Sequence, residues 1–386
     1  MPTLLMLHQS AELYGSDRVA LNVAGGLAQA GFEVIAILPD HGPLLPPLRA
    51  AGVECHVAPV GKLARSDLSL SGIVTRPAEL ARGIDAIRRT LAGRRPALVY
   101  SNTLAVIAGA AWAKLQGVKH LWHVHEIVLR PRVVSRLYPL AVRGFADRIV
   151  CNSTATRDWL VGSDARLAAR SAVVWNGVGE AGERLAGVRE QARAELGYAA
   201  HDVVVALVGR IHPRKGQEVL VEAAGQLWAR GRRDARFLIV GGSAPGETAF
   251  AERLRGMIAR SPAREAIRLL DFTDDVARIW AACDVAVVPS TAPESFGLVA
   301  VEAMAAGRPV IAARHGGVLD IVEDGLTGLF VPPGDAAALC DAIARLAADA
   351  DLRAGMGRAG RERQRRLFSA TEQVRVIASI CRSLVQ

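Results

Sequence analysis

The sequence predicts an α/β protein made of two Rossmann-like domains, each built on a parallel sheet. Apolar runs of strand length alternate with Ala-rich helical patterns along the whole chain. Uninterrupted apolar strands separated by helices are typical of parallel sheets that are buried on both faces. The alternation occurs as two series rather than one, and 386 residues are enough for two domains of ordinary size.

Each series contains six expected strands, joined by right-handed crossovers. In the first half we expect strands at Thr3–His8, Val34–Leu38, Leu98–Tyr100, Lys119–Val124, Arg148–Cys151 and Ala172–Trp175. In the second half we expect them at Val203–Val208, Arg236–Val240, Ile267–Leu270, Val285–Val288, Val310–Ala312 and Gly328–Phe330. The helical patterns between them, such as 18–30 and 104–116, are the crossovers.

The boundary between the two domains is expected in 175–202, where strand character gives way to glycine and charged residues. We therefore assign residues 1–178 to an N-terminal domain and 179–366 to a C-terminal domain. The tail from Ala336 has helical patterns, and a last helix at about 367–386 is expected to pack back on the first domain.

The composition favours a globular protein that stays in the cytoplasm. Hydrophobic residues make up 51% of the chain, yet no apolar run approaches the roughly 20 residues of a membrane-spanning helix. The N-terminus has neither a basic region nor a cleavage site of a signal peptide. Five cysteines are scattered without metal-ligand spacing, which predicts buried, reduced thiols and no metal site or disulfide framework.

The positive charge is concentrated in the first half. Of the formal net charge of +9, residues 1–178 contribute 20 Lys and Arg against 12 Asp and Glu. Such asymmetry suits an anionic partner, whether a nucleic acid, a membrane surface or a phosphorylated substrate. The alternative is an Arg-rich composition whose charges are simply solvated.

The stretch "PSTAPESFGLVAVEAMAAGRPV" predicts a loop and a helix after a buried strand, with Gly307 ending the helix. Ligands of α/β folds bind at this edge of the sheet. The expected helix is "FGLVAVEAMAA", and the unpaired amides at its start, those of Ser295, Phe296, Gly297 and Leu298, favour an anion. Glu294 and Glu302 are about 10 Å apart by helical rise, similar to the sugar–ribose separation of a nucleotide-sugar, and carboxylates accept bonds from vicinal hydroxyls. The alternative places Glu302 merely on a surface.

Two other strand ends carry candidate ligand groups. In "VALVGRIHPRKGQEVLVEA", Arg210 and Lys215 lie beside an expected helix start, an arrangement that suits a diphosphate. The alternative is a pair of solvated charges in a loop. In "LLDFTDDV", Asp274 and Asp275 either frame a nucleobase or cap the following helix.

The order of these motifs resembles the retaining glycosyltransferases of family four, which have the GT-B fold. GRxxxxKG, "FLIVGG", "LLDFTDD", "CDVAVVPS", E-x7-E and "GGVLDIVEDGLTGLFVPPGD" follow one another as in that family. In the first half, "YGSDRVALNVAGGLAQAGFEV", "LWHVHE" and "VVWNGV" resemble its glycine loop, its acceptor-side histidine segment and its domain-closing segment. The similarity covers nearly the whole chain.

The resemblance implies site residues position by position. Those implied in catalysis are His125, Arg210, Lys215 and Glu294, with no metal ligands. Those implied in donor binding are Gly15, Ser16, Gly209, Asp274, Phe296, Gly297, Leu298 and Glu302. The chain departs from the family where Gly15-Ser16 replaces a Gly-Gly pair, and at Gly179 and Asp320.

The resemblance also implies a fold and a reaction. The fold is GT-B, with two parallel sheets facing across a cleft. The reaction is metal-independent transfer of a sugar, with retention, from a nucleotide-sugar such as a UDP- or GDP-sugar to a hydroxyl of a glycan or lipid-linked acceptor. No further cofactor is expected. Two alternatives stay open: a GT-B nucleotide-sugar epimerase, and a basic nucleic-acid-binding protein, although no recognisable nucleic-acid motif is present.

The segment 129–148 places five arginines among apolar residues. A basic amphipathic helix can lie on an anionic bilayer, so peripheral contact with the inner face of the membrane is one interpretation. An ordinary packed helix is the other. "DAD" at 349–351 and the glycine-rich 240–246 are interpreted as a helix surface and an ordinary loop. His8, His41, His56, His120 and His123 are interpreted as core or surface residues.

Overall fold

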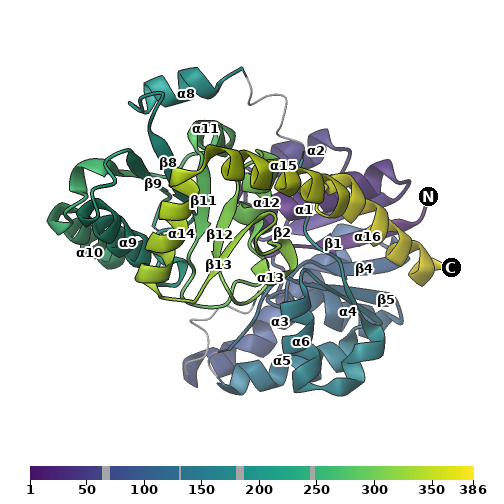
Figure 1. Cartoon of the computed structure of the whole chain (residues 1–386). Coiled ribbons are helices and arrows are strands. Elements are labelled where there is room, and N and C mark those ends of the chain that lie inside the picture. The colour runs from purple at the N-terminus through teal and green to yellow at the C-terminus, as the bar shows by residue number, and fades with distance from the viewer. Residues whose placement is uncertain (63–69, 130–131, 180–186, 244–247) are drawn as a thin grey trace. The chain divides into compact units, whose positions relative to one another are not determined.

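The structure is a computed structural model that describes residues 1–62, 70–129, 132–179, 187–243 and 248–386 (Figure 1). Its contacts divide the chain into two compact units. The first unit is Met1–Gly177 together with Ala370–Gln386, and the second is Val178–Ser369.

The first unit contains a parallel sheet of seven strands in the order β3-β2-β1-β4-β5-β6-β7. Chain order reverses between β1 and β4, so that Leu4 pairs with both Val34 and Leu98. Loops after β1 and β4 diverge to opposite faces there, which makes this edge a binding position in doubly wound sheets. The strands are Thr3–Leu7, Glu33–Leu38, Glu54–Val57, Leu98–Ser101, Lys119–Val124, Arg148–Cys151 and Ser171–Val173 for β1 to β7.

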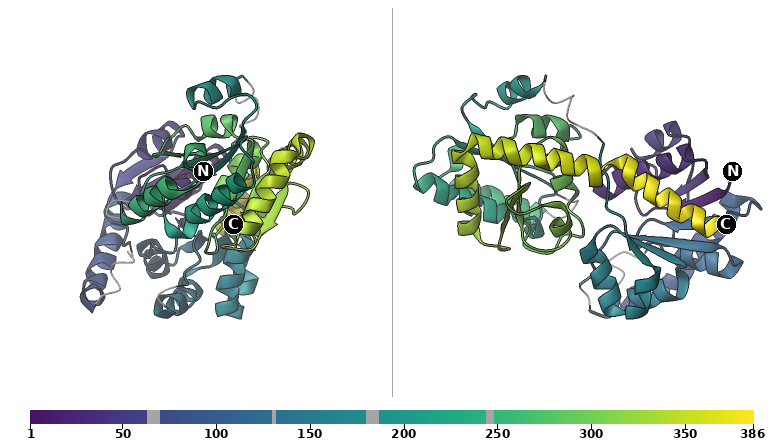
Figure 2. Two further views of the ribbon diagram at one scale, coloured as in Figure 1. Left: turned by 60° about the vertical axis from the view of Figure 1, so that its left-hand side comes forward. Right: turned by 45° about the vertical axis from the view of Figure 1, so that its right-hand side comes forward.

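Helices cover both faces of this sheet. They are α1 (Gly15–Gln29), α2 (Leu45–Ala50), α3 (Leu70–Leu91), α4 (Ala108–Gln116), α5 (Arg132–Phe145) and α6 (Thr154–Ser163), with the terminal α16 (Ala370–Val385). The terminal helix packs on α1 (Figure 2). Its Gln373 accepts a hydrogen bond from the Gly177 amide at 3.0 Å, and its Arg382 donates to the Ala30 carbonyl at 2.9 Å.

The second unit contains a parallel sheet of six strands in the order β10-β9-β8-β11-β12-β13, with its own reversal between β8 and β11. The strands β8 to β13 are Val203–Val208, Ala235–Val240, Ile267–Leu270, Val285–Val288, Val310–Ala313 and Gly328–Val331. The helices are α8 (Arg189–Glu195), α9 (Gln217–Ala229), α10 (Thr248–Arg260), α11 (Val276–Ala282), α12 (Leu298–Ala305), α13 (Val318–Ile321), α14 (Ala336–Ala348) and α15 (Ala350–Leu367).

The expected strands are confirmed to within two residues at each end, because their apolar side chains are buried in the two cores. One strand, β3, was not expected. It lies at the edge of the sheet beside β2, with which it pairs, and carries the polar residues Glu54 and His56. Arg94 pairs with Glu54 at 2.7 Å on its exposed side. An edge strand with one wetted side lacks the apolar run that marks the central strands.

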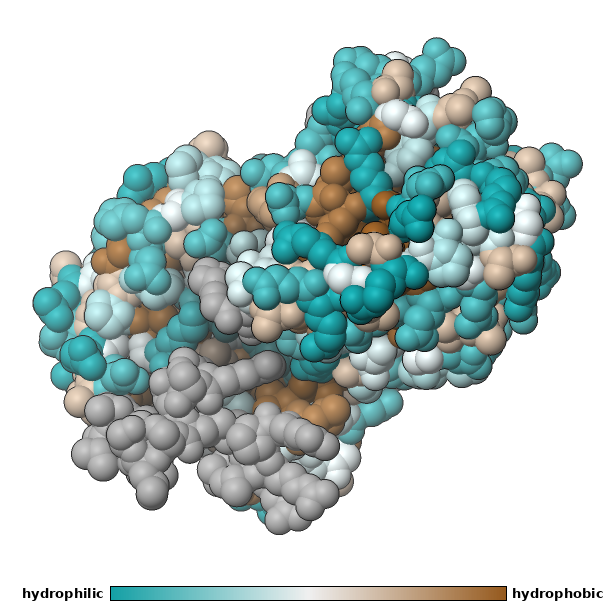
Figure 3. Space-filling model, turned by 90° about the vertical axis from the view of Figure 1, so that its left-hand side faces the viewer, coloured by the Kyte–Doolittle hydropathy of each residue, from teal (hydrophilic) through white to brown (hydrophobic). Residues whose placement is uncertain are grey.

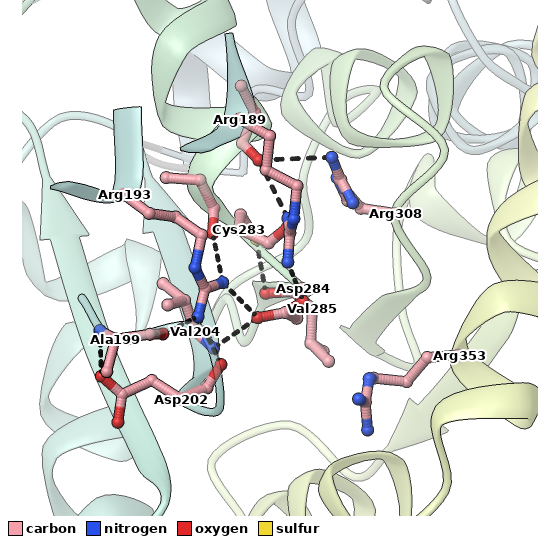
Figure 4. Close-up of polar contacts among 12 residues, drawn as sticks. Arg189, Arg193, Ala199, Asp202, Val204, Cys283, Asp284, Val285, Arg308 and Arg353 are labelled. Carbon is pink, nitrogen blue, oxygen red and sulfur yellow. Dashed lines mark hydrogen bonds and ion pairs between the residues drawn. The ribbon is translucent and has the colours of Figure 1, made fainter. Parts of the chain in front are cut away.

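The amino ends of the second sheet are joined to α8 by a network of ion pairs (Figure 4). Asp284, just before β11, accepts from Arg189 at 2.6 Å, Arg193 at 3.0 Å and the Val204 amide at 2.8 Å. Arg193 also donates to the Ala199 and Asp202 carbonyls, each at 2.6 Å. Because these guanidinium groups satisfy backbone carbonyls at the strand entrances, the network serves the fold.

Among the described residues, no helix combines the length and apolarity that crossing a bilayer requires. On the face shown in Figure 3, hydrophobic residues form separate patches among hydrophilic ones. The five cysteines are free thiols, four of them buried, whereas Cys55 on the edge strand is only partly covered.

Candidate functional site

Two loops meet at the carboxyl edge of the second sheet, at the reversal between β8 and β11. The loop after β8 and the loop after β11 are joined by hydrogen bonds from the Thr291 amide to the Arg214 carbonyl at 3.0 Å and from its hydroxyl to Pro213 at 3.1 Å. Gly216 has φ +75°, and a Cβ there would lie 1.9 Å from the Pro289 carbonyl oxygen. This contact therefore requires glycine.

The two loops bring together Lys215 and Glu294, which are far apart in the sequence. The Lys215 ammonium contacts both carboxylate oxygens, at 2.8 and 3.0 Å, and the Ser290 hydroxyl donates to one of them at 2.5 Å. Burial raises the pKa of Glu294, but the charge and hydrogen bonds of Lys215 and the Ser290 bond outweigh it, so the pKa lies below its ordinary value. Glu294 is thus an ionised acceptor that is already oriented.

The loop after β12 supports Glu294 from the other side. The Gly317 amide donates to the Glu294 carbonyl at 2.8 Å, and His315 contacts the Ser290 carbonyl at 2.7 Å through Nε2. Gly316 has φ +70°, and a Cβ there would meet the Glu294 backbone at 2.4 Å. Ser290 and His315 were missed by sequence reasoning, since their contacts depend on the order of β11 and β12 in the sheet.

Arg210 lies on the same edge, one residue beyond Gly209 at the end of β8. Its side chain is exposed, and its carbonyl accepts from the Gln217 amide group at 3.0 Å. Among the described residues, no ion pair or hydrogen bond engages its guanidinium. The loop after β8 therefore carries an exposed cation, Arg210, which is available to an anion, as well as the Lys215 ammonium that Glu294 already holds.

The helix after Glu294 begins later than its sequence indicates. α12 starts at Leu298, with Gly297 at φ +105° as its N-cap, so the expected amides of Ser295 and Phe296 precede the helix. The Phe296 side chain is buried edge-on to Phe368, at a ring separation of 6.1 Å. The helix dipole and its first unpaired amides thus begin at Leu298, while Gly307 at φ +70° ends the helix as expected.

Glu302 lies in the second turn of α12 and is half-buried. Glu294 lies in the preceding loop, four residues outside the helix, so the separation expected from helical rise alone does not apply. On the loop after β10, the outermost strand of this sheet, Asp275 caps α11 by accepting from the Arg278 amide at 3.1 Å. Asp274 beside it is exposed after β10, and its role as a donor ligand stays a prediction.

In the first unit, His125 lies at the corresponding carboxyl edge, directly after β5. It is 7% exposed, its Nε2 is 3.2 Å from Asn102 Oδ1, and its ring contacts that of His123 at 3.9 Å. Burial, together with the positive charge that His8 carries whenever it is protonated, lowers the pKa of His125 to about 3. His125 is therefore a neutral imidazole at physiological pH. Gly15 and Ser16 form the first turn of α1 at this edge.

Two family profiles match this chain, one within each of the two units. The profile described as "Glycosyl transferases group 1" matches residues 188–363, and that described as "Glycosyl transferase 4-like domain" matches residues 14–177. The chain belongs to the group 1 glycosyltransferases of family four. The resemblance in the motifs of both halves is thereby confirmed.

Curated relatives of this glycosyltransferase align over part of its length. A D-inositol 3-phosphate glycosyltransferase of Corynebacterium efficiens is 42% identical over 171 residues, which is 44% of this chain and 40% of that protein. The Nocardia farcinica protein of the same name is 36% identical over 268 residues, 68% of this chain and 56% of that protein. The chain thus spans about half the length of the curated relatives it matches.

Solved structures match this glycosyltransferase end to end. HepE of Anabaena, in a complex with UDP and glucose, has a TM-score of 0.85 at 24% identity and covers 99% of this chain and 100% of its own. Sucrose-phosphate synthase from Thermosynechococcus elongatus has a TM-score of 0.79 at 24% identity, covering 100% and 99%. The expected GT-B fold is confirmed.

Proposed function

We propose that this chain is a retaining glycosyltransferase that moves a sugar from a nucleotide-sugar to an acceptor hydroxyl. The second unit holds the donor and the first unit holds the acceptor. The observation that carries the proposal is the Lys215–Glu294 pair at the reversal of the second sheet, beside the exposed Arg210. Cations next to an oriented carboxylate suit a ligand that joins a diphosphate to a polyol.

The cations stabilise the leaving group. When the bond from the anomeric carbon to the β-phosphate breaks, negative charge builds on the diphosphate, and groups already aimed at that charge lower the barrier. Arg210, Lys215 and the first amides of α12 fill this role. An ammonium has three N–H donors, so Lys215 can keep Glu294 and still donate to a phosphate oxygen.

Retention follows from substitution on one face of an oxocarbenium-like sugar. The acceptor oxygen forms its bond to the anomeric carbon on the face the diphosphate leaves, and the hydroxyl proton passes to the departing phosphate oxygen. Glu294 accepts hydrogen bonds from the sugar hydroxyls, Glu302 from the ribose, and His125 from a substrate hydroxyl. Gly209 and Gly297 let the phosphates approach the backbone, and Asp274 lies beside the nucleoside.

The donor we propose is a UDP-sugar. HepE, which shares the fold, is described in complexes with UDP and with UDP-glucose. A GDP-sugar is the comparison donor, because we expect the base to be recognised by the loop after β10 and not by the groups that bind the diphosphate. A screen of both nucleotide classes distinguishes them.

The acceptor we propose carries a negative charge. The basic excess of residues 1–178 and the name of the relatives, D-inositol 3-phosphate glycosyltransferases, both favour a phosphorylated polyol or a glycan linked to a lipid phosphate. With a lipid-linked acceptor, the enzyme would work at the cytoplasmic face of the inner membrane, with α5 as the contact. Sedimentation with vesicles of anionic and of zwitterionic lipid, at low and high salt, tests this contact.

The proposal is tested by a donor screen with an acceptor panel, following both sugar transfer and donor hydrolysis. Glu294→Gln keeps the size of the side chain but removes its charge, and we expect turnover to fall at least 100-fold, as for loss of a group aimed at the transition state. Glu218→Gln on α9, which removes the charge of an exposed pair with Arg253 of α10, is the matched control. If Glu294→Gln turned over as fast as the parent protein, the assignment of Glu294 to the donor site would be wrong. An epimerised donor without a transfer product would favour the epimerase.

A further inference from the structure

Four side chains form a continuous buried hydrogen-bond chain at the carboxyl edge of the first sheet. Asp17 Oδ1 is 2.7 Å from His8 Nε2, Asn102 Nδ2 is 3.0 Å from His8 Nδ1, and His125 Nε2 is 3.2 Å from Asn102 Oδ1. His8, Asn102 and His125 directly follow β1, β4 and β5, three neighbouring strands. We call Asp17–His8–Asn102–His125 the hydrogen-bond relay.

All four members are shielded from water. Their exposed fractions are 1% for Asp17, 2% for His8, 0% for Asn102 and 7% for His125. Buried polar groups need partners, and here each member has one that is also a member. A core histidine such as His8 and a helix-capping residue such as Asp17 can each be satisfied without a chain of four side chains. The continuation of the chain to His125 therefore calls for an explanation.

Asp17, the member farthest from His125, determines which atom donates and which accepts in every hydrogen bond of the relay. Asp17 Oδ2 accepts from the Tyr14 amide at 3.0 Å, so the ionised carboxylate accepts on both oxygens and His8 Nε2 must donate. His8 Nδ1 faces the Asn102 amide nitrogen at 3.0 Å and accepts from it. The Asn102 oxygen faces His125 and must accept from Nε2–H. His125 is left with a lone pair on Nδ1.

We infer that Asp17, His8 and Asn102 are positioning residues that hold His125 in its Nε2–H tautomer and so make its Nδ1 a hydrogen-bond acceptor for a substrate hydroxyl. The inference rests on the proposed function of His125. It needs no net proton transfer through the relay. Among the described residues, no hydrogen bond engages Nδ1, and the low pKa of His125 agrees with a neutral ring.

A second pattern of donors and acceptors would also connect the four side chains, but it would give His125 the opposite tautomer. If His8 donated from Nδ1, the Asn102 amide would turn over, its nitrogen would donate to His125 Nε2, and His125 would carry its proton on Nδ1. That nitrogen would then repel a hydroxyl that approaches as a donor. The ionised Asp17 carboxylate selects the first setting because it cannot donate to His8.

Asp17→Asn should switch the relay. The Tyr14 amide keeps the new side-chain oxygen, so the new amide nitrogen faces His8 Nε2 and forces it to accept. His125 should then carry its proton on Nδ1, and kcat should fall about 100-fold or more while the donor KM changes little. In the double variant Asp17→Asn with Asn102→Asp, the introduced carboxylate accepts from both histidines and should restore the Nε2–H tautomer and much of kcat.

The tautomer is read directly, without any substrate. In the full chain with ¹⁵N-labelled histidine, long-range proton–nitrogen spectra distinguish Nε2–H from Nδ1–H, and loss of one signal in His125→Gln assigns it. Ser101→Ala, which removes a buried 2.9 Å bond to His120 next to Asn102, is the control that should leave His125 unchanged. Thermal unfolding of each variant checks that it is folded.

The outcomes separate this inference from the proposed function. An Nδ1–H tautomer in the parent protein overturns the relay even if no variant folds. An unchanged tautomer in Asp17→Asn also overturns it, whatever the activity. A tautomer that switches and is restored in the double variant supports the relay. If that happens while no sugar is transferred by the parent, the relay stands and the proposed function fails.

Discussion

The two edges of the second sheet both carry ion pairs, but they use them differently. At the amino edge, Arg189 and Arg193 join Asp284 and also donate to backbone carbonyls of the strand entrances (Figure 4). At the carboxyl edge, Lys215 joins Glu294, and Arg210 beside it is exposed. In both places, burial opposes ionisation of the carboxylate, and hydrogen bonds and cations lower its pKa nevertheless.

The two edges differ in whether the N–H donors of their cationic side chains are used by the protein or are exposed. Every contact of Arg193 ends on the protein itself, and its side chain is 6% exposed. The Lys215 side chain is 33% exposed and Arg210 is more so. An ion pair whose cation also donates to backbone carbonyls stabilises a fold, whereas a pair whose cation has exposed N–H groups is available to a ligand. Variants at the two edges should therefore change different quantities.

Arg193→Ala should have the largest effect, and on stability. It removes the guanidinium that donates to the Ala199, Asp202 and Ala282 carbonyls. It also removes one of the two donors to Asp284 Oδ2, which keeps the Val204 amide, so the free energy of unfolding should fall by about 3–5 kcal/mol. Chemical denaturation measures this change. The control is Arg232→Ala, which removes a half-exposed pair with Asp234 and should cost at most about 1 kcal/mol. Turnover per folded molecule should be unchanged. If it fell, the ion pairs at the amino edge would also serve catalysis, and the proposed difference between the two edges would be wrong.

Lys215→Met should affect catalysis. It keeps the aliphatic volume but removes the charge aimed at the leaving diphosphate, so kcat should fall about 10²–10³-fold, equivalent to roughly 3–4 kcal/mol of barrier. Steady-state kinetics with the best donor measure it. Arg230→Met, which breaks an exposed pair with Asp341, should change kcat less than about twofold. Similar losses in both variants would mean that general surface charge, and not the site, is responsible.

Gly216→Ala tests the contact between the two loops that bring Lys215 to Glu294. Both Gly216 and Gly231 have positive φ, but a Cβ at 216 would lie 1.9 Å from the Pro289 oxygen, whereas one at 231 meets nothing within 4 Å. Gly231→Ala therefore measures backbone strain alone. Gly216→Ala should cost a further 1–3 kcal/mol, roughly, and also raise the donor KM. Equal effects of the two substitutions would show that the loops do not need this contact.

The smallest expected effect is on pH dependence. Because the pKa of Glu294 in the folded protein lies below its ordinary value of 4.5, the ion pair contributes fully above that pH and is lost as pH falls through the lowered pKa. Glu294→Gln should therefore be less stable than the parent by about 1 kcal/mol at pH 7, and the gap should close in acid. Urea unfolding between pH 3 and 7 measures it. A gap that does not change with pH would exclude the charge as its source.

Much of the fold could be predicted because central parallel strands are uninterrupted apolar runs. The edge strand Glu54–Val57 escaped prediction because its exposed side carries Glu54 and His56. The start of α12 was misplaced because Phe296 fits an apolar helical pattern, while Gly297 at φ +105° begins the helix only after it. Burial of Phe296 against Phe368 explains the apolar residue without a helix.

The sequence predicts candidate site residues one by one, but it does not predict their arrangement. Strand ends and motif order singled out Arg210, Lys215 and Glu294, yet the Lys215–Glu294 pair depends on β8 and β11 being neighbours, which no local pattern encodes. The same holds for the hydrogen-bond relay. His8 was interpreted as a core or surface residue, because its role depends on Asn102, which lies 94 positions away in the sequence.

The central claim is that the carboxyl edge of the second sheet binds the diphosphate of the donor. The most direct test is a crystal structure with an unhydrolysed UDP-sugar. We predict phosphate oxygens within about 2.7–3.2 Å of Lys215 Nζ and the Arg210 guanidinium, with sugar hydroxyls on Glu294. A donor bound elsewhere, or bound here with both cations turned away from the diphosphate, would contradict the claim.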